Sequence, residues 1–364
     1  LQQMYALDHA LYVSNLQHLN NRLTLDYGVR LSVFQNIGPA QVYLYEDPQD
    51  NIDIIRTDTL TYDRWQQIKT YVNIEPRFSL RYLLKEGQSL KVSYNRMAQN
   101  THLISSGTAP VPFNTWNPSN YYLKPQVADQ VAAGYFRNFR DNEYEFSAEG
   151  YYKQFVNVTD FADNAELFFN ENLSTEYRQG DAWAYGLEFF VNKTKGKLTG
   201  TASYTWSKSM RKIAGVNHGI EFPSNHDRRN VVNLQAAYDF SEKWVFGGTF
   251  TYSTGRPLTL PAGKYEYANY NPDVLTERNA YRLPAFHRLD LSVTLNPRKN
   301  ATRRWKGQWV FSVYNVYNRK NPFTIYTRTK QDKDGNILGD GTEKEARLIY
   351  LFPVLPSVTY NLKF

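Results

Sequence analysis

The 364-residue sequence lacks several residue types and patterns, and each absence excludes a class of protein. It contains no cysteine, which excludes a disulfide scaffold, a thiolate metal site and a cysteine nucleophile. No stretch approaches the roughly 18 to 20 consecutive apolar residues of a membrane-spanning helix, which excludes a helical membrane protein. The net charge of +7 is small for this length and both signs are dispersed, so nucleic-acid binding is not expected.

Aromatic side chains are abundant in contrast. The 29 Tyr, 21 Phe and 7 Trp make up 16% of the residues, yet the mean hydropathy is −0.60. Two classes of protein combine these properties. One is a soluble all-β protein, and the other is a membrane β-barrel, whose apolar and polar faces average to a polar score.

Apolar and polar residues alternate along most of the chain, as in a β-strand with one apolar face. In the segment His287–Asn296, the odd positions 289, 291, 293 and 295 are Leu or Val, and the positions between them are polar. With the C-terminal segment, the pattern predicts about thirteen strands of roughly ten residues. The other predicted strands are Ala6–Gln17, Leu23–Phe34, Tyr71–Leu83, Leu90–Met97, Gln130–Phe139, Tyr144–Phe155, Tyr185–Lys193, Lys197–Lys208, Asn230–Phe240, Trp244–Thr254 and Gln308–Asn318.

The two faces of these strands suit lipid on one side and water on the other. Alternate residues of Tyr71–Leu83 are Asn, Glu, Arg, Ser and Arg, which are too polar for the interior of a sandwich. The apolar faces are too aromatic for the outside of a soluble protein. A soluble β-sandwich or solenoid with a solvated polar face is the alternative. The long strands and the lack of a repeat of fixed period weigh against it.

Connection lengths alternate between short and long, which is typical of an outer-membrane barrel with periplasmic turns and extracellular loops. Short turns are predicted at Leu19–Arg22, Lys85–Gln88, Arg140–Glu143, Thr194–Lys197 and Ser241–Lys243, with a longer one at Pro297–Gly307. Long loops are predicted at Gly38–Thr70, Ser105–Lys124, Val156–Ala184, Arg211–Arg229, Gly255–Phe286 and Arg319–Ala346.

The C-terminal residues Val358, Tyr360, Leu362 and Phe364 alternate with polar residues. They resemble the terminal-strand signal by which the barrel assembly machinery recognises outer-membrane barrels; an amphipathic edge strand that ends in Phe by chance is the alternative. If Phe364 lies in the periplasm, thirteen strands place Leu1 on the extracellular side. Single-chain bacterial barrels have an even number of strands, so we expect residues 1–364 to be the C-terminal portion of a larger barrel.

Several segments together resemble the TonB-dependent receptors of the Bacteroidota outer membrane. The segments are EPRFSLRYLLKEGQSLKVSYNRMAQNTHLIS (75–105), KPQVADQVAAGYFRNF (124–139), YGLEFFVNKTKGKLTGTASYTWSKSMR (185–211), FPSNHDRRNVVNLQAAYDFSEKW (222–244), TGRPLTLPAGKY (254–265), RLPAFHRLDLSV (282–293) and VYNVYNRKNPFTIY (313–326). The resemblance implies roughly the last thirteen strands of a 22-stranded antiparallel transmembrane barrel. It also implies an upstream plug domain and coupling to the TonB–ExbB–ExbD complex.

No catalytic constellation stands out, and we predict no enzyme activity, metal or cofactor. His218 and His226 share a loop with Asp227, which is compatible with a divalent ion, but hydrogen bonding at the start of a strand is the simpler role. A calcium-loop pattern at positions 332, 334, 336 and 343 (Asp332, Asp334, Asn336, Glu343) lacks its required Gly, because Ile337 occupies that position. Asp334-Gly335 is more typical of a hairpin turn.

Aromatic and amide-rich loop segments are the candidate extracellular ligand surface, because they combine stacking faces with hydrogen-bonding groups. Anchoring of the barrel at the membrane interface is the alternative role for such aromatic residues. For Trp116 and Tyr121, in the middle of a loop, both roles stay open. The candidate residues are Trp116, Asn117, Tyr121, Tyr122, Tyr267 and Tyr270.

The leading functional hypothesis is active import of a nutrient or chelate across the bacterial outer membrane. Lipid, lipopolysaccharide, the assembly machinery and a surface lipoprotein are the further expected partners. A passive porin and a barrel enzyme are the alternatives, and the enzyme would need a Ser/His/Asp cluster that we cannot assemble. The side chains expected to line the lumen and hold the plug are Glu75, Arg77, Arg81, Lys91, Asn95, Glu145, Glu149, Asn233, Asp239, Arg288 and Asp290.

Overall fold

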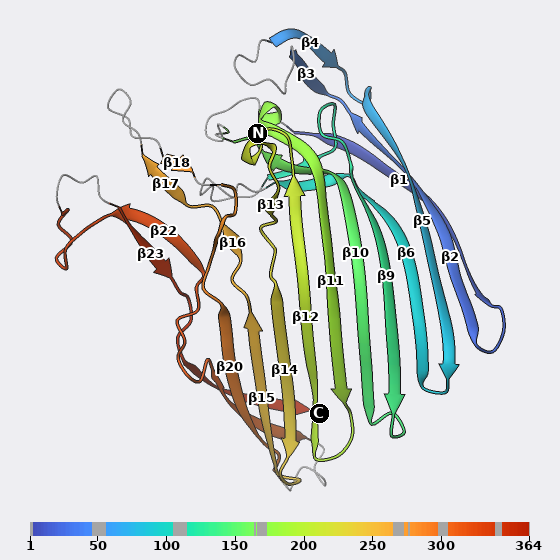
Figure 1. Ribbon diagram of the computed structural model, residues 1–364, viewed down its shortest axis with the longest axis vertical. Coiled ribbons are helices and arrows are strands. Elements are labelled where there is room, and N and C mark those ends of the chain that lie inside the picture. The colour runs from blue at the N-terminus through green and yellow to red at the C-terminus, as the bar shows by residue number, and fades with distance from the viewer. Residues whose placement is uncertain are drawn as a thin grey trace.

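The computed structural model describes residues 3–45, 56–104, 115–163, 165, 173–264, 273–275, 277–297, 305–338 and 344–363. Its main element is a fourteen-stranded antiparallel sheet in which thirteen strands follow one another in chain order (Figure 1). This confirms the predicted fold class and the predicted thirteen strands. They are β1 (Tyr5–His18), β2 (Leu23–Ile37), β5 (Gln67–Lys85), β6 (Gln88–Gln99), β9 (Gln126–Phe139), β10 (Tyr144–Phe161), β11 (Tyr177–Lys193), β12 (Leu198–Lys212), β14 (Asn230–Asp239), β15 (Trp244–Ser253), β20 (Phe286–Leu295), β21 (Lys306–Tyr314) and β24 (Leu355–Lys363).

Short turns connect these strands at one end of the sheet and long loops connect them at the other, as predicted (Figure 1). The β5–β6 turn is the tightest, since Lys85 and Gln88 are Cα partners, and Gly87 in it has φ +70°, which glycine adopts without steric cost. β1 begins at the loop end and β24 ends at the turn end. Within the described residues, each of these two strands pairs on one side only.

The outward face of the sheet is apolar and exposed. Val72 and Ile74 on β5 are 60% and 63% exposed, and comparable Val, Leu, Tyr and Phe side chains line the other strands. A surface of this kind is unstable in water but is the expected covering of a strand that contacts lipid. Among the described residues, no helix is long and apolar enough to cross a membrane.

Most strands extend a few residues beyond their predicted bounds, and β10, β11 and β21 differ for identifiable local reasons. β10 ends at Phe161 and β11 begins at Tyr177, so both strands include part of the loop predicted at Val156–Ala184. The alternation fades there because the outward residues Gln179 and Asp181 are polar. β21 ends at Tyr314 rather than Asn318, because Asn315 has φ +54° and its backbone N–H donates to Asp290 Oδ1 at 2.8 Å.

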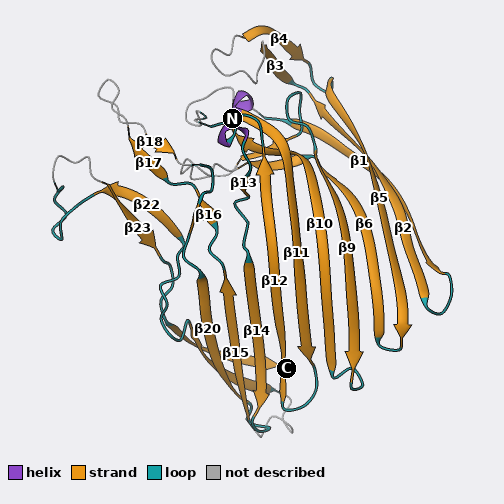
Figure 2. Cartoon of the chain, in the orientation of Figure 1, coloured by secondary structure: helices purple, strands orange, loops and turns teal. Residues whose placement is uncertain are grey.

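The long loops carry further short strands and two single-turn 3-10 helices, which lie at the loop end (Figure 2). The helices are η1 (Leu173–Glu176) and η2 (Asn217–Gly219). The strands are β3 (Ala40–Tyr45), β4 (Arg56–Tyr62), β7 (Thr101–Ile104), β8 (Thr115–Pro118), β13 (Phe222–Pro223), β16 (Pro257–Leu258), β17 (Pro261–Lys264), β18 (Asp273–Leu275), β19 (Tyr281–Arg282), β22 (Thr324–Thr329) and β23 (Lys344–Ile349).

The buried apolar core lies among these loops rather than inside the sheet. One cluster packs Val158 and Ala182, on the extensions of β10 and β11, against Ile213, Val216 and Phe222. A second cluster joins Ile104, Leu123 and Phe161. The sheet itself needs no such core, because lipid and water cover its two faces. The loop end of the sheet is therefore held by packing between loops.

Candidate functional site

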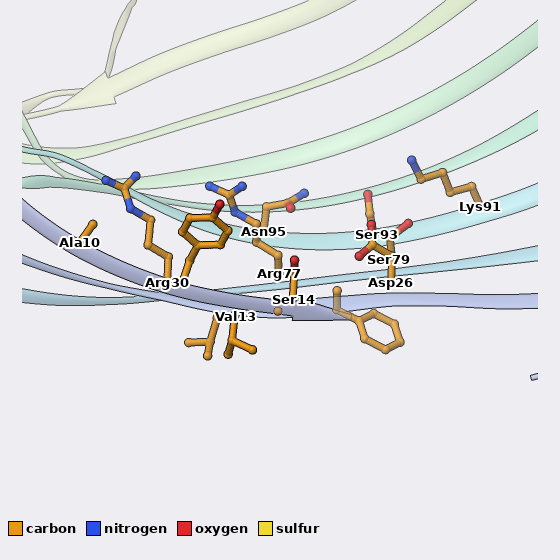
Figure 3. A pocket seen from close by; sticks show the side chains of 14 residues that line it. Ala10, Val13, Ser14, Asp26, Arg30, Arg77, Ser79, Lys91, Ser93 and Asn95 are labelled. Atoms are coloured by element: carbon orange, nitrogen blue, oxygen red, sulfur yellow. The ribbon is translucent and has the colours of Figure 1, made fainter. Parts of the chain in front are cut away.

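Polar side chains of β1, β2, β5 and β6 line a cleft of about 750 Å³ on the inner face of the sheet. Arg77 lies opposite Gly28 on β2 and Asn95 on β6, and Lys91 lies opposite Arg81. Figure 3 shows Arg30, Arg77, Asn95 and Lys91 on one side of the strands and Val13 on the other. The register therefore brings these expected lumen residues onto one face.

Positive charge predominates in this cleft. Its charged lining residues are Asp26, Arg30, Arg77 and Lys91. Glu75 lies on the same face but is 3% exposed, and its Oε1 accepts a hydrogen bond from Ser32 Oγ at 3.0 Å. The cleft is thus suited to hold an anionic group. The sequence prediction included Arg77, Lys91 and Asn95 but missed Arg30 and Asp26, although both occupy polar positions in an alternating segment.

Carboxylates gather on the inner face of β10 and β11. Glu149 and Glu188 are Cα partners, and Glu145 Oε2 accepts a hydrogen bond from Asn192 Nδ2 at 3.0 Å. Glycine on a neighbouring strand leaves room for one of them, because a Cβ on Gly134 would lie 2.9 Å from Glu149 Cγ. The inner wall therefore carries a group of carboxylates on β10 and β11, apart from the mainly cationic cleft.

The inner face continues to β20 with an ion pair. Arg288 Nε lies 2.9 Å from Asp290 Oδ2, and the Arg288 guanidinium lies 4.1 Å from the centre of the Tyr314 ring. Asp290 also accepts the backbone N–H that ends β21. Both charged side chains on β20 therefore also contact residues at the end of β21 and help to hold the two strands together.

The hairpin of β7 and β8 carries two of the candidate ligand residues on opposite faces. Leu103 and Trp116 are Cα partners and are 46% and 63% exposed. Asn117 is only 6% exposed, and its Nδ2 donates to Tyr177 Oη at 3.0 Å. The structure thus leaves Trp116 available to a ligand and uses Asn117 to fix the hairpin.

His102 lies on the buried face of the same hairpin. It is 4% exposed, and its Nε2 lies 3.1 Å from Ser119 Oγ. Burial lowers the pKa of this imidazole from its ordinary 6.5 to about 4, because an imidazolium would lose its hydration. The hairpin therefore contains a neutral histidine, which the sequence prediction did not single out.

Tyr121 and Tyr122 belong to a cluster of aromatic residues between two loops. Their ring centres lie 5.0 Å apart, edge to face. Tyr122 packs against Tyr45 and donates from Oη to the carbonyl of Tyr43 at 2.7 Å. Tyr121 is 38% exposed, and Lys69 Nζ lies 5.8 Å from its ring centre. Tyr122 is thus a structural contact and Tyr121 faces solvent, whereas Tyr267 and Tyr270 lie outside the described residues.

The Asp227 carboxylate is held by arginines. Its side chain is fully buried, and Oδ2 pairs with Arg282 and, at 3.1 Å, with Arg229 Nε. Oδ1 accepts the backbone N–H of Ser209 at 2.7 Å. Among the described residues, no group of three His, Cys, Asp or Glu is arranged to hold a metal ion. Asp227 therefore joins β12 to the loop that carries β19.

Asp332 closes a tight turn between β22 and β23. Its Oδ1 accepts the backbone N–H groups of Asp334 and Asn336, both at 2.9 Å, and Gln331 pairs with Ile337. These hydrogen bonds lower the pKa of the Asp332 carboxyl, the side-chain amide of Asn336 having the largest effect. The hairpin turn predicted at Asp334-Gly335 is thus confirmed. Glu343 lies outside the described residues.

The proposed assembly signal occupies the last strand. On β24, Val358, Tyr360 and Leu362 are 61%, 50% and 46% exposed, and Tyr360 packs against Trp309 with ring centres 4.7 Å apart. Phe364 lies outside the described residues. Recognition by the assembly machinery stays a prediction.

Solved structures of siderophore and iron receptors share this fold. The ferric-catecholate import receptor Fiu from E. coli K12 is 14% identical, with a TM-score of 0.59, over 98% of this chain and 44% of that receptor. The siderophore receptor PiuA from Acinetobacter baumannii is 14% identical, with a TM-score of 0.59, over 98% of this chain and 43% of its own. For the FrpB iron transporter from Neisseria meningitidis the values are 14%, 0.56, 99% and 46%.

At this identity the likeness shows the fold, and the chain spans less than half the length of these proteins. No curated protein matches the sequence. Residues 2–318 match the family described as TonB dependent receptor-like, beta-barrel. Members of this family are multi-pass β-barrels of the outer membrane. They act as transporters and receptors and depend on TonB for energy coupling. The chain belongs to the TonB-dependent receptor-like β-barrel family.

Proposed function

We propose that this protein actively imports a ligand across the bacterial outer membrane, with energy supplied through TonB–ExbB–ExbD. The observation that carries the proposal is the wall of thirteen antiparallel strands, apolar outside and charged inside, in a chain that matches the family over residues 2–318. The polar inner wall would hold a plug domain and line the path of the ligand. In this proposal residues 1–364 form part of the wall of the passage. The plug and the segment that contacts TonB belong to another part of the protein.

We assign the chain to the C-terminal portion of a 22-stranded barrel of the Bacteroidota type. Among the described residues, β1 and β24 each pair on one side only, which supports this assignment because a barrel in a membrane has no free edges. The motifs in Tyr185–Arg211 and Val313–Tyr326 support the Bacteroidota type. The mass of the protein purified from native membranes tests the assignment, and we expect a value well above 42.5 kDa.

An anionic ferric chelate is the ligand class that the site favours. Arg30, Arg77 and Lys91 line the inner cleft, and Trp116 and Tyr121 offer exposed rings at the loop end. The names of the similar structures include a ferric-catecholate import receptor and a siderophore receptor. Ferric catecholates are anions with flat rings, so both features complement them. Lipopolysaccharide and a surface lipoprotein are proposed as further partners.

Uptake of iron-55 as a ferric catecholate tests the function in cells that express the full-length protein. We expect uptake that stops when TonB is deleted or a protonophore is added. Arg77→Gln should reduce uptake, whereas Arg347→Gln, on the exposed β23, serves as the matched control. Uptake that persists without TonB, together with a channel that stays open in planar bilayers, would instead support a passive porin.

A further inference from the structure

A stacked aromatic pair lies at the turn end of β9 and β10. The rings of Phe139 and Tyr144 have centres 5.2 Å apart and planes inclined by 3°. The two residues are Cα partners across the hairpin, and Asn138 and Glu145, next to them, face the inside. Phe139 and Tyr144 therefore face outward, where the family places lipid.

Three cations surround this pair. The guanidinium of Arg137 lies 5.5 Å from the centre of the Phe139 ring, and that of Arg140 lies 5.6 Å from the Tyr144 ring. Lys193, the Cα partner of Tyr144 on β11, places Nζ 5.5 Å from the same ring. Distances of this size allow cation–π attraction, which orients each cation over the outward face.

Only one of the three cations has a carboxylate partner in the part of the chain that the structure describes. Lys193 Nζ lies 3.3 Å from Glu143 Oε1 and also donates to the carbonyls of Lys195 and Leu198. No described carboxylate forms an ion pair with the guanidinium of Arg137 or Arg140. Two guanidiniums therefore remain to bind an anion at this edge of the wall.

We propose that Arg137 and Arg140, arranged around the Phe139–Tyr144 pair, bind the headgroup of an anionic phospholipid of the phosphatidylglycerol type. The turn end of the sheet lies at the periplasmic surface, where the acyl chains of the inner leaflet meet their phosphates. A guanidinium binds phosphate oxygens through two parallel N–H groups. A phosphatidylethanolamine headgroup carries its own ammonium, which offsets its phosphate and weakens this attraction. The exposed Phe139 ring and the half-buried Tyr144 ring would contact the upper part of the acyl chains.

The turn that joins β14 and β15 provides a matched control. Lys243 Nζ lies 5.7 Å from the centre of the Trp244 ring, a similar cation–aromatic contact at the same end of the sheet. That turn contributes a single cation. Lys243→Gln removes one surface charge without touching the proposed site.

Native mass spectrometry of the full-length protein tests the proposal, after equilibration with equal amounts of phosphatidylglycerol and phosphatidylethanolamine in detergent. We expect preferential retention of phosphatidylglycerol. Arg137→Gln and Arg140→Gln should each lower that preference about fivefold, since a basic side chain at a membrane surface contributes about 1 kcal/mol. Lys243→Gln should retain it. Equal retention of the two lipids by the wild type, or an equal loss in Lys243→Gln, would overturn the proposal.

Two further arms distinguish a lipid site from a free-phosphate site and from a failure of the barrel to assemble. Inorganic phosphate at millimolar concentration should leave the bound lipid in place, and its displacement would indicate a site for free phosphate instead. Arg140 lies in the turn, outside the strands, so Arg140→Gln keeps the test available if the variant in β9 fails to assemble. Energy-dependent uptake should continue in both variants, so this result is independent of the transport assignment.

Discussion

The buried histidine of the β7–β8 hairpin makes the stability of this hairpin depend on pH. The closed hairpin holds His102 neutral, with a pKa of about 4, whereas an opened hairpin exposes an imidazole with the ordinary pKa of 6.5. The open state therefore binds a proton more readily. Stability is fully present above pH 6.5, falls as the pH drops from 6.5 to 4, and changes no further below 4.

The expected loss is about 2 kcal/mol between pH 8 and pH 5, which enlarges the open population about 30-fold. Hydrogen–deuterium exchange of residues 101–104 and 115–118, corrected for the intrinsic rate at each pH, measures this population. His102→Gln provides the control, because an amide can hydrogen-bond Ser119 without titrating. A wild-type change below about threefold, or an equal change in His102→Gln, would refute the assignment of the effect to this imidazole.

Three other substitutions test separate parts of the structure. Gly186→Val should lower the free energy of unfolding in detergent by about 2 kcal/mol, because a Cβ there meets the Trp206 carbonyl at 2.7 Å; Gly150→Ala, which meets only the flexible end of a leucine at 3.2 Å, should change it less. Asp227→Asn removes a fully buried carboxylate from two partly exposed arginines, and we expect a loss of about 2 kcal/mol and faster proteolysis of the loops; unchanged digestion would contradict the role of this carboxylate. Trp116→Ala should reduce capture of the ferric chelate in a binding assay and leave the unfolding midpoint unchanged, since the side chain is 63% exposed; a lowered midpoint would assign Trp116 to packing.

The strands of the wall could be predicted closely from the sequence. The segment predicted at His287–Asn296 is β20 (Phe286–Leu295), and the segment predicted at Asn230–Phe240 is β14 (Asn230–Asp239). Lipid on one face and water on the other impose a period of two on every residue of such a strand. The prediction fails where this contrast ends, at the outer extensions of β10 and β11.

The loop packing could not be predicted, because its contacts join residues far apart in the sequence. Arg278 is 4% exposed, and its Nη2 donates to Asp163 Oδ1 and to the carbonyl of Phe161, both at 3.1 Å. Its backbone N–H donates to Asn217 Oδ1 at 2.7 Å. No local pattern predicts which loops share such a residue. One arginine thus joins the loops that follow β10, β12 and β15, and these loops form one packed layer above the wall.

Contacts between distant residues also explain why some candidate ligand residues are exposed and others are buried. In the segment that contains β8, Trp116 and Asn117 are adjacent and chemically suited to bind a ligand, so composition alone does not separate them. Strand alternation sends the two side chains to opposite faces. Which face is buried depends on Tyr177, which is the first residue of β11 and accepts the hydrogen bond of Asn117. Packing of the β7–β8 hairpin against β11 therefore selects the surface that a ligand can reach, and it leaves Trp116 on that surface.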